Sequence, residues 1–581
     1  MEAADETLDL LIVGAGLYGT YAANTYLQLH PTANIKVLDA DADAGGVWSR
    51  GRLYPKFWSQ TGARLSGFPD VPFKVAEDAP RYHDLFEAKH LTSYLEDYVS
   101  IHEYEGASLR ERFVFNCWVT KIRKDDDDDV WRIKAKLGGR DVSYTASKLI
   151  IATGQNSIPH IPRLPGQESF KGPIIHQKDF GRSKIFTPDE ENADDHTNAT
   201  ILGGSKSASD IAYAAATDTT SPRKVNWIIR TTGAGPLILS KAQGFGKYKS
   251  LPELGSIRAI ASLSSANPFL PDSWWSYFLH RTPVGEWLLN QIWSKNEKES
   301  KAIANYHGRE GALPGFEKLE TETKMRWRSG SIGLLQSDNF WDVIAKNVQV
   351  YRGEVVNLEE DVVVLDDGRT VRTDMLLCAT GWRQEYSSFD AHEAARLGLP
   401  ISLNEKDIVA EMRQHWSKLE DDADRKVLQR WPYLKQTEGF HKHTVDSTSY
   451  KLYNLTVPPN DQSIAFLGVQ LVPNSYHAAG VQTLYAIAVL DGAIELPSIA
   501  KMEEEIAFMN RWCPRRYPLG GWKGNVLDYE MVSFTDYLLE QLGLSSHKKQ
   551  SWWGDLTDPC LAADYAGLVD EYWKKYVRVG S

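Results

Sequence analysis

The sequence predicts an α/β protein built around two βαβ units of the kind that bind dinucleotides. The order of apolar strand, glycine turn, helix and second strand occurs twice, over residues 10–39 and again over residues 199–230. The first unit closes on an acidic residue, Asp39, and the second on a basic one, Arg230. With 581 residues and 42% hydrophobic content, the chain is long enough for about two to four domains with filled cores.

The charge and the cysteine content of the chain limit the binding partners and the chemistry that can be expected. The formal net charge is −12, which argues against nucleic acid or an anionic membrane surface as the main partner and favours a small molecule. The four cysteines are widely spaced and form no C-x-x-C pair, so disulfide-reductase chemistry is disfavoured and a reducing compartment is expected.

The chain carries no sequence signal for membrane insertion or export. It has no uncharged apolar stretch of about eighteen residues, and its acidic first residues are unlike a signal or transit peptide. We therefore expect no transmembrane segment and a cytoplasmic protein.

The first βαβ unit has its three glycines at the spacing that a bound dinucleotide requires, at Gly14, Gly16 and Gly19. Gly14 permits the tight turn, Gly16 lets the backbone approach a pyrophosphate, and Gly19 lets the helix pack on the strand. The helix N-terminus offers unpaired N–H groups and the positive end of its dipole. Asp39 ends the second strand, where its carboxylate can accept hydrogen bonds from ribose hydroxyls.

An aromatic, glycine-rich loop follows this unit. It contains Gly45-Gly46-Val47-Trp48 and the stretch 52–70, and it shows little periodicity. Such a loop is suited to wrap a large flat ring system, and the alternative is a surface loop whose aromatic side chains fill a core.

These residues resemble the class B flavoprotein monooxygenases, and among them the flavin-containing monooxygenases. The shared features are the first glycine turn, an acid six positions before Gly-Gly-x-Trp, and a Tyr-Pro…Thr-Asn-Thr…Phe-x-Asp stretch. In this chain that stretch is present, in register, as Tyr54-Pro55, Ser59-Gln60-Thr61 and Phe68-Pro69-Asp70.

One departure from the family concerns the expected reaction centre. Family members usually carry Asn where this chain has Gln60, and that Asn is thought to contact the flavin edge during oxygen activation. Gln keeps the amide but moves it outward by one methylene. The resemblance therefore implies Gln60 as the catalytic polar group, with Thr61 and Trp48 shaping the pocket.

The resemblance also implies further flavin contacts and two crossings between nucleotide domains. Gly46 and the backbone of Val119 are expected to contact FAD. The strand ends Ala152-Thr153-Gly154 and Ala379-Thr380-Gly381 look like the two crossings. A late strand at 464–468 and a helix containing Gln482 resemble the family's last flavin-side elements.

Residues 170–180 fit the F-x-G-x-x-x-H-x-x-x-[FY] signature of flavin-containing monooxygenases. Relatives that perform Baeyer–Villiger chemistry carry Trp followed by Pro or Asp at the last positions, where this chain has Phe180-Gly181. This difference favours N- or S-oxygenation over lactone or ester formation. His176 is interpreted as a structural strut between domains rather than a catalytic base.

The second glycine turn differs from the first in a way that bears on its nucleotide. It reads Gly203-Gly204-Ser205-Lys206-Ser207, and Ser205 replaces the second glycine while adding a hydroxyl donor. Arg230, helped by Lys206, can pair with a 2′-phosphate that an acid such as Asp39 would repel. The first site therefore suits FAD and the second NADPH, the alternative being that Arg230 is a surface residue at a strand end.

Residues 237–339 are expected to form amphipathic helices whose aromatic stripe belongs to the core, the alternatives being a partner surface or a substrate lining. Residues 386–463 match no motif. No metal site is predicted: the aspartates at 125–129 are expected at a solvated hairpin tip, and His441 and His443 lack a third ligand.

The expected fold is α/β, with two Rossmann-like dinucleotide-binding domains for FAD and NADPH, the second inserted in the first. The expected divisions are 1–165 for the first FAD half, 166–382 for the NADPH domain with its helical insertion, and 383–581 for the second FAD half and substrate side.

The resemblance implies a monooxygenase in which NADPH reduces the flavin, O2 adds to give a flavin C4a-hydroperoxide, and one oxygen atom passes to a small organic substrate. N- or S-oxygenation is the leading reaction. The alternatives are Baeyer–Villiger oxygenation of a ketone and a non-oxygenating NADPH oxidase-like flavoprotein.

Overall fold

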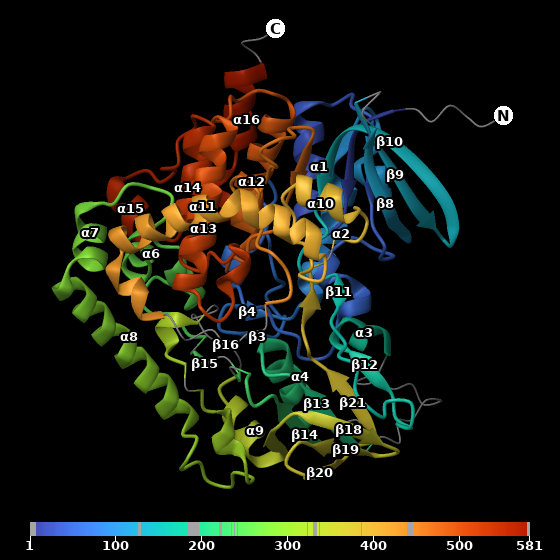
Figure 1. Ribbon diagram of the computed structural model, residues 1–581, viewed down its shortest axis with the longest axis vertical. Helices are drawn as coiled ribbons and strands as arrows, with labels where there is room; N and C mark the ends of the chain where they lie inside the picture. The colour runs from blue at the N-terminus through green and yellow to red at the C-terminus, as the bar shows by residue number, and fades with distance from the viewer. Residues whose placement is uncertain are drawn as a thin grey trace.

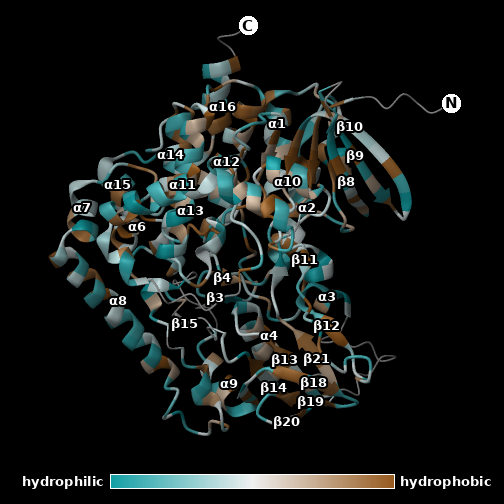
Figure 2. Cartoon of the chain, viewed as in Figure 1, coloured by the Kyte–Doolittle hydropathy of each residue, from teal (hydrophilic) through white to brown (hydrophobic). Residues whose placement is uncertain are grey.

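The chain folds around two β-sheets, one at the upper right and the other at the bottom of the computed structural model in Figure 1. Hydrophobic residues concentrate on the strands of both sheets (Figure 2). The structure describes residues 7–125, 129–183, 197–219, 223–233, 235–236, 239–240, 242–321, 323–328, 334–335, 337–384, 386–437 and 445–577. The predicted hairpin tip falls partly, and His441 and His443 wholly, outside these ranges.

The first sheet contains seven strands in the order β7-β2-β1-β10-β9-β8, with β23 also paired to β10. The first half of β10 pairs antiparallel with β9, and its second half pairs parallel with β1 and β23. The strands are β1 (Leu8–Val13), β2 (Ile35–Leu38), β7 (Phe113–Val114), β8 (Cys117–Asp125), β9 (Val130–Leu137), β10 (Arg140–Ile151) and β23 (Ile464–Phe466).

Two helices from opposite ends of the chain pack together against this sheet. Helix α1 (Leu17–Leu29) follows the first glycine turn, and α12 (Ser475–Leu490) follows β23. Every residue of α12 after Ser475 is buried, which explains why this helix lacks a polar face. Helix α2 (Lys89–Ile101) also contacts α1.

The second sheet contains five parallel strands in the order β12-β21-β13-β14-β17. They are β12 (Ile174–His176), β13 (Asn198–Leu202), β14 (Lys224–Ile229), β17 (Val348–Arg352) and β21 (Met375–Cys378). All five lie in sequence between β10 and β23, which pair in the first sheet. The second unit is therefore inserted in the first, which confirms the predicted fold class.

Smaller elements complete this region. Helices α4 (Lys206–Ala216) and α9 (Phe340–Asn347) contact each other beside the second sheet. A three-stranded antiparallel sheet is formed by β18 (Val355–Glu359), β19 (Val362–Leu365) and β20 (Thr370–Arg372). Two-stranded pairs are β3–β4 (Arg81–Tyr82, Leu85–Phe86), β5–β6 (Glu103–Tyr104, Ala107–Ser108) and β15–β16 (Leu239–Ser240, Leu334–Leu335).

The two connections between the sheets lie side by side. Strand β11 (Ile158–Pro159) in the first connection pairs antiparallel with β22 (Trp382–Arg383) in the second. Nearby, Nε2 of His176 lies 2.9 Å from the carbonyl oxygen of Gly381, and burial lowers the pKa of this imidazole. Its position fits the structural role predicted for His176.

Residues 237–339 contain helices, as expected, but only part of their aromatic stripe is core. The helices are α5 (Pro252–Gly255), α6 (Arg258–Ser264), α7 (Trp274–Arg281) and α8 (Pro283–Ala304). Leu289 and Trp293 are buried, whereas Trp274 is 78% and Trp287 61% exposed. The spacing was right for a helix but did not separate the buried residues of the stripe from the exposed ones, because α7 and α8 lie at the edge of the molecule (Figure 1).

The region without motifs and the C-terminal region form a mostly helical layer. Its helices are α10 (Ala391–Arg396), α11 (Lys406–Arg430), α13 (Ile499–Arg516), α14 (Met531–Gln541), α15 (Trp552–Thr557) and α16 (Leu568–Tyr572), whereas the short helix α3 (Phe180–Ser183) lies apart, at the linker after β12. The longest two, α11 and α13, pack against each other. Among the described residues, none of the helices combines the length and apolarity needed to cross a membrane.

A buried arginine joins the inserted helices to this C-terminal layer. Arg516 is 2% exposed, and it donates to Oγ of Ser265 at 2.9 Å and to the carbonyl oxygen of Arg326 at 2.7 Å. His280 on α7 is buried beside the same group, with Nε2 2.8 Å from the carbonyl oxygen of Ser262. Burial, reinforced by the Arg326 and Arg516 charges, lowers the pKa of His280 to about 4.

We expect His280 to make the fold acid-sensitive. Its pKa is lower in the folded chain, so between pH 6.5 and about 4 the unfolded chain binds more protons and stability falls as the pH falls. The expected loss at pH 5 relative to pH 8 is about 2 kcal/mol. Urea unfolding of the wild type and His280→Gln across this range measures it, and identical pH dependence in the two proteins would contradict it.

Candidate active site

A cleft of about 440 Å³ opens beside the first glycine turn and the end of β10. It collects residues from seven segments that are separated in the sequence, 13–18, 38–52, 117–122, 151–158, 178, 386–388 and 468–475. The predicted cofactor residues that line it are Gly14, Gly16, Asp39, Gly46, Trp48, Val119, Ala152, Thr153 and Gly154. These predictions therefore converge on one concave site.

The glycine turn leaves no room for side chains at the floor of this cleft. A Cβ on Gly14, where φ is +108°, would lie 2.4 Å from the carbonyl oxygen of Ala152. A Cβ on Gly46 would lie 3.0 Å from Cα of Gly16, and one on Gly19 would lie 1.8 Å from the carbonyl oxygen of Gly14. Bare backbone at the start of α1 fits a pyrophosphate, because N–H groups can reach it directly.

Asp39 lines the cleft at the end of β2 and is held by the turn itself. One carboxylate oxygen accepts from the N–H of Ala15 at 2.5 Å, and the other accepts from the N–H of Asp41 at 2.7 Å. Burial raises the pKa of Asp39 against the opposing effect of these hydrogen bonds. The side chain is thus fixed in orientation before any ribose hydroxyl reaches it.

Two cationic side chains that sequence reasoning missed also line the cleft. Arg52 lines the cleft and donates to the carbonyl oxygen of Asn156 at 2.8 Å and to Asp41 at 3.2 Å. Lys178 also lines it and donates to the carbonyl oxygen of Ser157 at 2.7 Å. The two cations come from segments that are distant in sequence, so no local motif could have grouped them. Their charge suits the phosphates of a dinucleotide.

Asp41 links this wall to the linker after β12. Burial acts to raise the pKa of Asp41, but Arg52 and Arg182 together hold it below its usual value. Arg182 on α3 donates to Asp41 at 2.7 Å. The carboxylate therefore stays charged and orients Arg52 toward the cleft.

The predicted catalytic loop lies next to the cleft, and neither Gln60 nor Thr61 is part of its lining. Gln60 is half-buried, and Nε2 lies 3.4 Å from the carbonyl oxygen of Ser59. Thr61 donates to the carbonyl oxygen of Pro473 at 3.2 Å, just before α12. The loop is therefore fastened to the start of the helix that backs the cleft, and the catalytic role of Gln60 stays a prediction.

Stacked aromatic rings connect this loop to the linker. Trp48 stacks on Phe57 with centroids 5.4 Å apart, and Phe57 stacks on Tyr54 at 4.7 Å. Tyr54 meets Phe180 edge-on at 6.1 Å. The aromatic loop thus both borders the cleft, through Trp48, and fills a seam between the two units.

Gln482 requires a correction. It was expected to contact the cofactor, but it is fully buried in α12 behind the cleft wall. Its carbonyl accepts from Gly468 N–H at 3.3 Å and from Gln470 at 2.7 Å, while its amide donates to Thr456 at 2.9 Å. Gly468 and Gln470 line the cleft, so Gln482 supports the wall instead of forming it.

The second glycine turn repeats the construction of the first. A Cβ on Gly203, where φ is +131°, would lie 2.2 Å from the carbonyl oxygen of Ala379. Trp227 donates to the carbonyl oxygen of Gly203 at 2.7 Å. The turn then enters α4 through Ser205, with Ser207 in the first turn of the helix. Bare backbone at this helix start fits a second dinucleotide phosphate.

The other residues predicted to bind a nucleotide in the second unit lie close to its glycine turn or beside the contact between the two units. Thr380 donates to the carbonyl oxygen of His160, and the carbonyl of Gly381 accepts from His160 N–H at 3.0 Å. Arg230 follows β14 with its side chain exposed. A Cβ on Gly204 would lie 2.9 Å from Ile229 and 3.5 Å from Cα of Gly235.

Lys206 was expected to help Arg230 with a 2′-phosphate, and this role stays a prediction. Its ammonium pairs with the buried carboxylate of Asp210 one helical turn along α4. It also lies 5.1 Å from the centroid of the Phe57 ring. Lys206 therefore faces the seam with the first unit.

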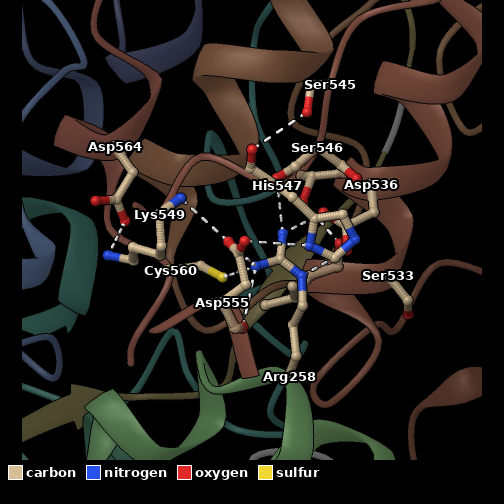
Figure 3. A network of polar contacts seen from close by, with 12 residues as sticks. Arg258, Ser533, Asp536, Ser545, Ser546, His547, Lys549, Asp555, Cys560 and Asp564 are labelled. Atoms are coloured by element: carbon tan, nitrogen blue, oxygen red, sulfur yellow. Dashed lines mark hydrogen bonds and ion pairs between the residues drawn. The ribbon is translucent and has the colours of Figure 1, made fainter. Parts of the chain in front are cut away.

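A polar network fixes the inserted helices against the C-terminal layer (Figure 3). Arg258 on α6 donates to both carboxylate oxygens of Asp536 on α14 at 2.8 and 2.9 Å, and to the carbonyl oxygen of Ser546 at 2.9 Å. Its guanidinium also lies 3.1 Å from Sγ of Cys560. Because these groups are buried, the paired geometry is needed to offset their desolvation.

The segment before α6 is fastened to the predicted catalytic loop. Arg64, four residues after Gln60, lies 3.4 Å from the buried carboxylate of Glu253 on α5. A Cβ on Gly62 would lie 2.8 Å from Oγ of Ser250, so the two segments touch. The inserted helices therefore pack over the loop that carries Gln60 and Thr61.

Comparison with known proteins decides the family. A family model described as L-lysine 6-monooxygenase/L-ornithine 5-monooxygenase matches residues 78–242. The FAD-dependent monooxygenase DEP4 of Alternaria brassicicola is 30% identical over 585 residues, which cover 98% of this chain and 95% of that protein. The chain belongs to the class B flavoprotein monooxygenases. FAD and NADPH, the cofactors expected from the sequence, agree with this membership.

Solved structures show that this monooxygenase shares its fold with enzymes of differing specificity. Polycyclic ketone monooxygenase from Thermothelomyces thermophila has a TM-score of 0.60 at 15% identity, covering 100% of this chain and 90% of that one. S-allyl-L-cysteine S-oxygenase from Allium sativum has a TM-score of 0.51 at 14% identity, covering 99% and 94%. At these identities the likeness establishes the fold alone.

We expect Arg52 to contribute to FAD affinity in this monooxygenase. Arg52→Gln removes a buried positive charge from the cleft wall and should raise the FAD dissociation constant about tenfold. Arg50→Gln is the matched control, since Arg50 lies two residues away but is exposed and pairs with Glu96. FAD titration of the apoproteins measures the effect, and equal affinities in the two variants would contradict it.

Proposed function

We propose that this monooxygenase uses NADPH to insert one atom of dioxygen into a soft nitrogen or sulfur nucleophile of a small organic substrate. The support is the linker signature that ends in Phe180-Gly181, together with the way these two residues pack. Baeyer–Villiger relatives place Trp followed by Pro or Asp at these positions.

The packing of Phe180-Gly181 is the observation that carries the proposal. A Cβ on Gly181 would lie 2.4 Å from the carbonyl oxygen of Leu53 and 2.7 Å from that of Gly51. Phe180 is buried and meets Tyr54 edge-on. The linker therefore rests directly on the loop that leads to Gln60, in a contact that the side chain of Pro or Asp would not fit.

The residues of the cleft and of the loop beside it have separate tasks in this proposal. Gly14 and Gly16 would hold the FAD pyrophosphate beside Arg52 and Lys178. FAD supplies the activation of dioxygen once it is reduced. Gln60 would offer its amide to the reacting oxygen, while the inserted helices over its loop exclude water. We place the domain divisions after residues 165 and 382, near the two connections between the sheets.

A matched substrate panel tests the proposed reaction. The purified FAD-loaded enzyme is given a thioether, a tertiary amine and a cyclic ketone, with NADPH consumption and product mass followed together. We expect the thioether or amine to gain one oxygen atom in step with NADPH consumption. Conversion of the ketone alone to a lactone would establish the Baeyer–Villiger alternative, and hydrogen peroxide without any oxygenated product would indicate an oxidase.

Gln60 is expected to control coupling between NADPH consumption and product. Gln60→Ala removes the amide and should raise hydrogen peroxide release several-fold per NADPH consumed, whereas Gln60→Asn should retain most of the coupling. A peroxide assay beside product quantification makes the measurement. Unchanged coupling in Gln60→Ala would remove Gln60 from the reaction centre.

A further inference from the structure

We propose that Arg352, at the end of β17, is a positioning residue that gives this monooxygenase its preference for NADPH over NADH. It acts by holding the described residues of the turn after β14, 230–233 and 235, in the shape that presents Arg230 to the 2′-phosphate. This inference rests on the proposed function in one respect, the assignment of Arg230 to that phosphate.

The Arg352 guanidinium gathers backbone carbonyls from two separate segments. Nη1 donates to the carbonyl oxygens of Arg230 at 3.1 Å and Gly233 at 2.8 Å, and Nε donates to that of Lys318 at 3.0 Å. The Arg230 carbonyl is thus held twice, because the Gly233 N–H also donates to it at 3.0 Å. The Arg230 side chain itself is exposed.

Gly235 extends this support to the glycine turn of the same unit. A Cβ on Gly235 would lie 2.4 Å from Nη2 of Arg352, and a Cβ on Gly204 would lie 3.5 Å from Cα of Gly235. Arg352, Gly235 and Gly204 are therefore in consecutive close contact. The loop after β13 is suited to the pyrophosphate and the loop after β14 to the adenosine ribose, so this contact sets the spacing between the two phosphate positions.

The charges around the turn favour an anion. Arg352 and the buried Arg328 both lie against it, and Nη2 of Arg328 donates to the carbonyl oxygens of Gly235 and Pro236 at 3.2 and 3.1 Å. Glu354 is the opposing charge, and its carboxylate accepts from Thr231 N–H at 3.2 Å. With Arg230 included, three guanidinium groups face one carboxylate at a turn expected to meet a phosphate of about two negative charges.

This arrangement predicts a selective loss that general damage to the fold would not produce. NAD⁺ shares every part of NADP⁺ except the 2′-phosphate, so it reports on the pyrophosphate and ribose contacts alone. If Arg352 acts through Arg230, its removal weakens NADP⁺ binding and leaves NAD⁺ binding nearly unchanged. Because both residues then serve one interaction, their effects should not add.

The test measures dissociation constants of NADP⁺ and NAD⁺ for the FAD-loaded enzyme by calorimetry, together with kcat and KM for both reduced nucleotides. For Arg352→Met we expect an increase of about tenfold for NADP⁺, less than twofold for NAD⁺, and a raised KM for NADPH at nearly constant kcat. Arg352→Lys should fall between, since it keeps the charge but cannot hold both carbonyls in the same way.

Two further variants make the outcome decisive. Gly235→Ala keeps both arginines but places a methyl group against Nη2 of Arg352, so it should reproduce the selective loss. Arg372→Met is the matched control, since Arg372 lies on β20, is 73% exposed in its side chain and pairs with Asp361. It should leave both dissociation constants unchanged.

The possible failures are distinguishable. Equal weakening of NADP⁺ and NAD⁺ in Arg352→Met, with Arg230→Met selective for NADP⁺, would overturn the role of Arg352 while the 2′-phosphate site stands. Equal effects of Arg230→Met on both nucleotides would remove the 2′-phosphate assignment itself. A double variant combines Arg230→Met with Arg352→Met. If the two losses of NADP⁺ affinity add fully in it, Arg352 does not act through Arg230.

Discussion

The architecture depends on one close contact, made twice, between a glycine turn and the carbonyl end of a neighbouring strand. Gly14 approaches Ala152 in the first unit, and Gly203 approaches Ala379 in the second, each at a distance that excludes a Cβ. Each contact brings a helix N-terminus to the edge of a sheet where two strands diverge. The phosphate positions follow from it, because only bare backbone lies there.

The second constraint is the pairing of β10 with β23, which joins residues more than three hundred positions apart. It adds β23 to the first sheet after the inserted unit and brings α12 to the back of the cleft. Gln482 then holds Gly468 and Gln470, and Pro473 receives the hydroxyl of Thr61. The position of the loop that carries Gln60 therefore depends on a segment that lies about four hundred residues later in the chain.

Much of this fold could be predicted, because each βαβ unit is a local pattern and the glycine spacing has a direct geometric cause. The cleft wall could not be predicted in the same way. Arg52, Asp41 and Arg182 meet only after the sheets form, so no spacing in the sequence connects them. Periodicity likewise predicted helices α7 and α8 but not which face is solvent-exposed, since that depends on what lies beside them. Gln482 was misplaced for the same reason: it lies behind the cleft wall and is fully buried.

The two units solve the same orientation problem with opposite chemistry. Asp39 and Arg230 stand at equivalent positions, each directly after the second strand of its unit. Asp39 is fixed through its side chain, which accepts two backbone N–H groups. In the proposed function Arg230 keeps its guanidinium available for a phosphate, and its carbonyl accepts from Arg352. An acceptor that must meet hydroxyls can share its carboxylate oxygens with the backbone, because each oxygen has two lone pairs. An arginine that must donate several N–H groups to a phosphate is best fixed through its backbone. Arg352, on the strand next to β14, supplies this support.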